Sequence, residues 1–155
     1  MIKFHRILLP TDFSANSRMA QAYACDFAEQ HQAELHLLHV TQEMVLVAAD
    51  PLSGFTLPAA NTDAARTGVE RELKNFLDPA WTAKRRVVHA VRSGSPFVEV
   101  VRYAREHEID LIVISTHGRT GLAHVLLGSA AENIVRTAPC PVLTVRPDDH
   151  KYEAP

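Results

Sequence analysis

Five short apolar runs recur along the chain, and segments with helical periodicity lie between them. The runs cover residues 7–9, 35–40, 86–91, 110–114 and 142–145, and they are rich in leucine, isoleucine and valine. The continuous apolar runs at residues 7–9 and 110–114 are typical of buried strands, the second of a strand buried on both faces. Regular alternation of strand and helix predicts parallel pairing with right-handed crossovers. The expected fold is therefore α/β, a doubly wound parallel sheet with helices on both faces.

The intervening segments each place apolar residues on one helical face. Ser14 and Ser95 stand where the first and third helices should be capped, and Pro96 suits the first turn of the third. Pro79 is expected to end the second helix. The four predicted faces consist of Ala20, Ala24, Phe27 and Ala28; of Val69, Leu73, Phe76 and Leu77; of Phe97, Val100, Val101 and Ala104; and of Ala131, Ile134, Val135 and Ala138.

Two stretches fall outside this alternation. Residues 41–63 show no persistent pattern, and a connection of that length is usually a lid or an insertion. Residues 148–155 form a short polar tail. The 155 residues contain no internal repeat, so we expect one domain over residues 1–147 followed by this tail.

Composition narrows the class of protein. The formal net charge is −2 and no basic stripe occurs, which argues against nucleic acid or an anionic membrane as partner. The two cysteines, Cys25 and Cys140, form no CxxC motif, so a reducing compartment is the default. Since neither a signal-peptide core nor a run long enough to span a bilayer is visible, we expect a cytoplasmic protein.

Residues 115–129 carry the strongest chemical signal. This glycine-bearing stretch leaves the end of a predicted strand and leads into a helix, where unpaired N–H groups and the helix dipole favour anions. Ser129 and Glu132 also have the spacing of a capping box, which would need no ligand. Gly118 and Gly121 favour a phosphate site, because glycines let the backbone approach a ligand closely.

The kind of phosphate site bears on catalysis. Neither GxxxxGK[ST] nor GxGxxG occurs, and the side chains of His117 and Arg119 offer donors to an anion in this loop. Binding is therefore favoured over fast phosphoryl transfer, although slow ATPase activity or self-phosphorylation at Ser129 or Thr116 stays open. The histidines show no metal-ligand spacing, so Mg²⁺ or Mn²⁺ is expected only with bound phosphates.

Ligands of such sheets bind beyond the carboxyl ends of the strands, where the strand order reverses. The loop after the first strand begins at Pro10 and Thr11 and therefore joins the predicted site. Asp12 in that loop has two interpretations, as a ligand contact or as the acceptor of an Asx turn. His36 and His39 are expected on opposite faces of the second strand.

The loop resembles the signature of the universal stress protein family, G-x2-G-x9-G-[ST]. The spacing matches throughout at Gly118, Gly128 and Ser129, and Ser115 replaces the first glycine. Residues 7–14, 38–40 and 138–143 are similar to the family's opening strand and turn, second strand and closing segment. The resemblance implies a five-stranded, Rossmann-like sheet of order 3-2-1-4-5.

The resemblance also implies a homodimer joined through the last strand, at residues 141–145, and ATP bound across strands one and four. On matching positions, Asp12 and the Val40 backbone would contact the nucleoside, and Ile114 and Ser115 would lie by the ribose. The phosphates would be held by Gly118, Arg119, Gly128, Ser129 and Ala130. The implied function is an ATP-binding stress-response regulator; the alternative is a nucleotide-independent dimeric interaction or chaperone-like module.

Overall fold

A computed structural model describes residues 1–42, 63–116 and 128–146. Its elements along the chain are β1 (Arg6–Pro10), α1 (Ala15–His31), β2 (Glu34–Thr41), α2 (Asp63–Lys74), α3 (Pro79–Thr82), β3 (Val87–Ser93), α4 (Pro96–Glu106), β4 (Leu111–Ser115), α5 (Ser129–Thr137) and β5 (Val142–Val145). The five strands form one parallel sheet in the order β3-β2-β1-β4-β5. The predicted fold class and strand order are confirmed.

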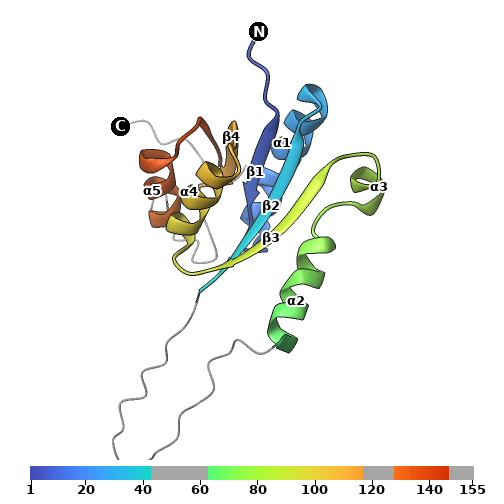
Figure 1. The fold of residues 1–155 in the computed structure, drawn as a ribbon, viewed down its shortest axis with the longest axis vertical. Helices are drawn as coiled ribbons and strands as arrows, with labels where there is room; N and C mark the ends of the chain where they lie inside the picture. Colours follow the sequence, from blue (N-terminus) through green and yellow to red (C-terminus); the bar gives the residue numbers. More distant parts are fainter. Residues whose placement is uncertain (43–62, 117–127, 147–155) are drawn as a thin grey trace, which may run out of the picture.

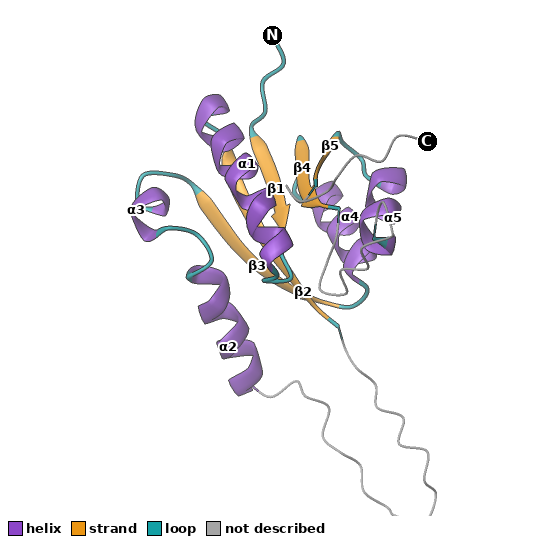
Figure 2. Ribbon diagram, turned by 180° about the vertical axis from the view of Figure 1, so that it is seen from behind, coloured by secondary structure: helices purple, strands orange, loops and turns teal. Residues whose placement is uncertain are grey.

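Alternate residues of the central strands serve two separate cores. Ile7 and Leu9 of β1 pack on one face with α1 and with the chain that follows α2, whereas Leu8 packs on the other face with α4 and α5. Figures 1 and 2 show α1 on one side of the sheet and α4 with α5 on the other. Both faces are buried, which is why these strands are continuously apolar rather than alternating.

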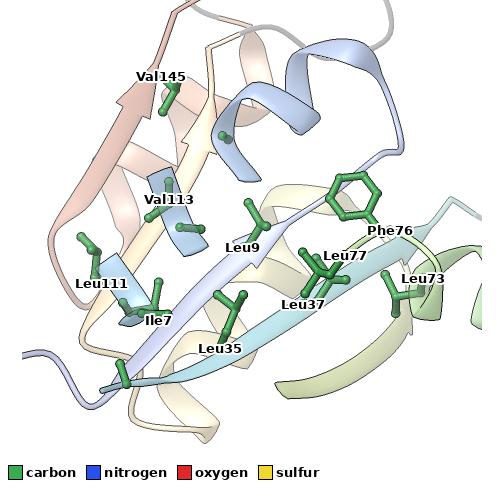
Figure 3. Packing of buried hydrophobic residues seen from close by; sticks show 14 residues of the cluster. Ile7, Leu9, Leu35, Leu37, Leu73, Phe76, Leu77, Leu111, Val113 and Val145 are labelled. Carbon is green, nitrogen blue, oxygen red and sulfur yellow. The ribbon is translucent and has the colours of Figure 1, made fainter. Parts of the chain in front are cut away.

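Small residues allow α1 to lie close to the sheet. Ala20, Ala24 and Ala28 recur every four residues and are fully buried. Beyond α1 the same core is extended by Leu73, Phe76 and other residues near the end of α2 (Figure 3). The predicted apolar face of the first helix is therefore confirmed at its three alanines.

Two details of the predicted helices are wrong. The second helix, α2, ends at Lys74, so Phe76 and Leu77 are buried from the turn that follows the helix. Pro79 does not end this helix but begins α3. Asp78 caps α3, because its side chain accepts a 2.8 Å hydrogen bond from the Ala80 N–H. Val135 is 46% exposed. The buried stripe of α5 contains Ala131 and Ile134, and Val135 lies about 100° further round the helix.

The strand order places the predicted site. β1 lies between β2 and β4, and Ile7 and Leu8 pair with Leu111 and Ile112. The chain leaves β1 toward one face of the sheet and leaves β4 toward the other. The reversal of strand order therefore lies between β1 and β4, the position where ligands of doubly wound sheets bind. No helix in the described ranges is long and apolar enough to cross a membrane.

Candidate functional site

The loop after β1 is closely bonded to its surroundings. The Thr11 N–H donates to the Leu38 carbonyl at 2.8 Å, which continues the pairing of β1 with β2. The Thr11 hydroxyl oxygen accepts from the Phe13 N–H at 3.0 Å and lies 3.0 Å from the Ser17 hydroxyl. Thr11 is only 6% exposed, and its hydrogen bonds fix the start of this loop.

Asp12 forms the Asx turn that was one of its two interpretations. Its Oδ1 accepts from the Ser14 N–H at 3.0 Å. Ser14 is the N-cap of α1, as predicted, and its hydroxyl oxygen accepts from the Ser17 N–H at 3.2 Å. A carboxylate offers about four acceptor positions, so this turn uses part of the capacity of Asp12. The turn is therefore compatible with a second contact from the same carboxylate.

The start of α5 supplies main-chain donors. Gly128 is the N-cap and no side chain of the described residues caps the helix, so Ser129, the first helical residue, does not form the capping box that its spacing from Glu132 allows. The first helical bond runs from Glu132 N–H to the Gly128 carbonyl at 2.9 Å. The N–H groups of Ser129, Ala130 and Ala131 therefore have no acceptor within the helix. Ser129 and Ala130 are exposed, at the positive end of the helix dipole.

Gly128 is held against the end of β4. Its N–H donates to the Thr116 carbonyl at 2.7 Å, and a Cβ at position 128 would lie 3.3 Å from the same oxygen. The Thr116 N–H in turn donates to the Val145 carbonyl at 2.9 Å. These bonds tie the start of α5 to β4 and β5, so the helix N-terminus has a defined place at the carboxyl edge of the sheet.

Most of the predicted site residues come together at this edge. Ile114 is buried in the core against α4 and α5, so its side chain contributes packing. His117, Gly118 and Arg119 lie outside the described residues. The predicted site residues that lie at or next to the carboxyl ends of β1, β2 and β4, or at the start of α5, are Pro10, Thr11, Asp12, Val40, Ile114, Ser115, Gly128, Ser129 and Ala130.

Sequence reasoning did not assign His39 and Phe13 to this site. Their rings stack with centroids 4.4 Å apart and planes 23° apart. His39 lies on the face of β2 opposite His36, as predicted, and its Nδ1 lies 2.8 Å from the Thr11 carbonyl oxygen. No local pattern predicts these contacts, because they join His39 of β2 to residues in the loop after β1.

The titratable groups with shifted pKa values lie away from this edge. Burial lowers the pKa of His36, although the hydrogen bond to Glu34 opposes the shift. Burial raises the pKa of Cys25 and of Cys140 to about 11. Among the described residues, no group of three or more histidine, cysteine or acidic side chains could hold a metal ion. A groove of about 400 Å³ between α4 and the end of α5 contains none of the predicted site residues.

Comparison with known proteins agrees with the fold and the loop signature. The model of the universal stress protein family matches residues 3–146. The chain belongs to this family. Universal stress protein MJ0577 of Methanocaldococcus jannaschii is 31% identical over 157 residues, which cover 94% of this chain and 96% of the relative. Universal stress protein YxiE of Bacillus subtilis is 31% identical over 147 residues, covering 92% and 99%.

Solved structures of universal stress proteins have the same architecture. The structure of MJ0577 has a TM-score of 0.73 at 25% identity and covers 96% of this chain and 99% of that one. UspA from Lactobacillus plantarum has a TM-score of 0.67 at 26% identity, covering 94% and 100%. Two more distant structures of this fold, at 22% and 17% identity, are a universal stress protein in complex with cAMP and one from Archaeoglobus fulgidus in complex with dAMP.

Proposed function

We propose that this universal stress protein binds ATP, or another adenine nucleotide, across the carboxyl ends of β1 and β4. The observation that carries the proposal is the start of α5. Its first N–H groups have no acceptor within the helix, its first residues are exposed, and its N-cap is bonded to the end of β4. Phosphate groups bind at such helix starts because N–H donors and the helix dipole act together.

The described residues fit a nucleotide at this edge. A Cβ at position 128 would meet the Thr116 carbonyl oxygen at 3.3 Å and would require a shift of a few tenths of an ångström, so glycine lets α5 begin close to the end of β4. Asp12 and Val40 lie at the ends of β1 and β2 on the same edge, where the nucleoside would lie. Mg²⁺ or Mn²⁺ would arrive with the phosphates and offset their charge. The predicted phosphate contacts at Gly118 and Arg119 are part of the same proposal.

The complexes of other family members support an adenine ligand. Proteins of this fold have been solved with cAMP and with dAMP, both of which carry adenine and a phosphate. The relative MJ0577 matches nearly the whole chain, so the loop that carries the family signature lies within the matched region. These similarities support an adenine nucleotide as the ligand of this protein. Titration with ATP, ADP and AMP would determine how many phosphates the preferred nucleotide carries.

We extend the proposal to a cytoplasmic, homodimeric regulator of stress responses that joins through β5. β5 is an end strand of the sheet. The carbonyls of Pro141 and Val145 accept from Ile112 and Thr116, so the main-chain groups of Val142 and Thr144 face away from β4. An edge with outward-facing donors and acceptors can pair with another chain.

Calorimetry tests the nucleotide proposal directly. Protein shown by mass spectrometry to carry no nucleotide would be titrated with ATP, ADP and AMP, with and without Mg²⁺. Micromolar binding of ATP is expected. No heat with any of the three nucleotides would refute nucleotide binding and favour the nucleotide-independent dimer as the working form of the protein.

A further inference from the structure

Phe13 has a backbone conformation that its residue type disfavours. Its φ is 65°, in the left-handed region that residues with a Cβ rarely adopt. Gln32 and Glu108 share this feature among the described non-glycine residues, but each follows the last turn of a helix, where left-handed residues are common. Phe13 lies inside the β1–α1 loop of the proposed site. Surrounding contacts must therefore hold it there.

Two aromatic rings enclose Phe13. His39 stacks on it at 4.4 Å, and Phe76 meets it edge-on at 6.0 Å. The Phe13 N–H is also bonded to the Thr11 hydroxyl oxygen. Aromatic contacts of this kind stabilise a ring beyond the burial of its area, so they can offset the strain at Phe13.

His39 contacts the loop at a second point. It is 9% exposed, and its Nδ1 lies 2.8 Å from the carbonyl oxygen of Thr11. A carbonyl oxygen only accepts, so Nδ1 carries the hydrogen and donates it. One imidazole ring therefore contacts the loop on both sides of Asp12, at the Thr11 carbonyl and at the Phe13 ring.

We propose that His39 is a positioning residue for the nucleoside end of the site. By holding the Thr11 carbonyl and the Phe13 ring, it keeps the loop in the strained form in which Asp12 makes its turn with Ser14. This inference rests on the proposed nucleotide function and names the residue that prepares the site before a ligand arrives. A preformed loop raises affinity because the cost of ordering it is met in folding rather than in binding.

Three variants of His39 separate the ring stack on Phe13 from the hydrogen bond to the Thr11 carbonyl. His39→Asn keeps an N–H donor near the Nδ1 position without the ring. His39→Phe keeps a ring for stacking without the donor, and His39→Leu lacks both. We expect His39→Leu to bind ATP about tenfold more weakly, as expected when an ordered hydrogen bond and a stack are lost together, and the other two to lose less.

Two further readouts distinguish positioning from general support of the fold. Inorganic tripolyphosphate lacks a nucleoside, so its affinity should be the same for His39→Leu and the unchanged protein. Hydrogen exchange in ligand-free protein should accelerate at the Phe13 and Ser14 amides, which donate to Thr11 and Asp12, while core amides of β1 and β4 keep their protection.

Each outcome decides the inference. Selective loss of ATP affinity with faster exchange at the two loop amides supports it. Unchanged ATP affinity in His39→Leu overturns it, and so does a parallel loss of ATP, tripolyphosphate and core protection. If the unchanged protein binds neither ligand, nucleotide binding itself fails, and exchange at the two loop amides alone decides whether His39 positions the loop.

Discussion

Replacing Ser129 by glutamate should weaken ATP binding without destabilising the fold. Ser129 is the exposed first residue of α5, and its carbonyl accepts from the Asn133 side chain at 2.9 Å. Ser129→Glu leaves that bond and the core untouched. An acidic side chain in the first turn stabilises a helix by about 0.3–1 kcal/mol. The fold should therefore become slightly more stable, not less.

The same carboxylate should weaken binding of a polyanion. Two unit charges roughly 6 Å apart repel each other by about 3 kcal/mol at an effective dielectric constant near 20. Allowing for screening by salt, a loss of about 2 kcal/mol corresponds to roughly 30-fold weaker binding of ATP. The loss should shrink as salt rises, because this charge is exposed.

The assay pairs calorimetric titration of ATP with urea denaturation of the ligand-free protein, at low and at high salt. Ser129→Gln is the matched control, since it has the same shape without the charge, and it should bind ATP within about threefold of the unchanged protein. Equal ATP affinity for Ser129→Glu and Ser129→Gln would refute the placement of phosphates at the start of α5.

Three further predictions follow from the described structure. Burial lowers the pKa of His36 in the folded protein, so its contribution to stability is complete above the unfolded pKa of about 6.5 and is lost as the pH falls toward the lower folded value. Urea denaturation across this pH range should therefore show a free energy of unfolding that depends less on pH in His36→Gln than in the unchanged protein. An equal pH dependence in the two proteins would contradict this prediction. Thr144→Pro removes an N–H that faces away from β4, so light scattering should show monomers with an intact fold, whereas a persistent dimer would exclude the β5 interface. The pKa of about 11 at Cys25 and Cys140 predicts slow alkylation by iodoacetamide at neutral pH, and rapid labelling of folded protein would contradict the raised pKa values of these thiols.

Much of the fold follows from local patterns. Strands such as β1 and β4 are continuous apolar runs because both of their faces are buried, and alanines every four residues mark the buried side of α1. The strand order came from family resemblance, since alternation alone predicts parallel pairing without an order. Boundaries were less accurate. Pro79 was expected to end a helix, but a proline also suits the first position of a new helix, as in α3.

Local sequence predicts only part of the candidate site, because some of its contacts join segments that are distant in the sequence. Local sequence identifies a helix start near Gly128 and a turn at Asp12, because caps and turns depend on neighbouring residues. The spacing of Ser129 and Glu132 does not decide the N-cap, because glycine and serine are both acceptable there, and Gly128 takes that position. The contacts of His39 with Thr11 and Phe13 depend on the pairing of β1 with β2, which no local pattern contains.

A crystal structure of the protein grown with ATP and Mg²⁺ would show where the phosphates bind. We expect phosphate oxygens within hydrogen-bond distance of the Ser129 and Ala130 N–H groups, with the adenine and ribose near Asp12 and Val40. ATP bound in the crystal at any other place, or its absence from this edge in protein that binds ATP in solution, would contradict a nucleotide site at the start of α5.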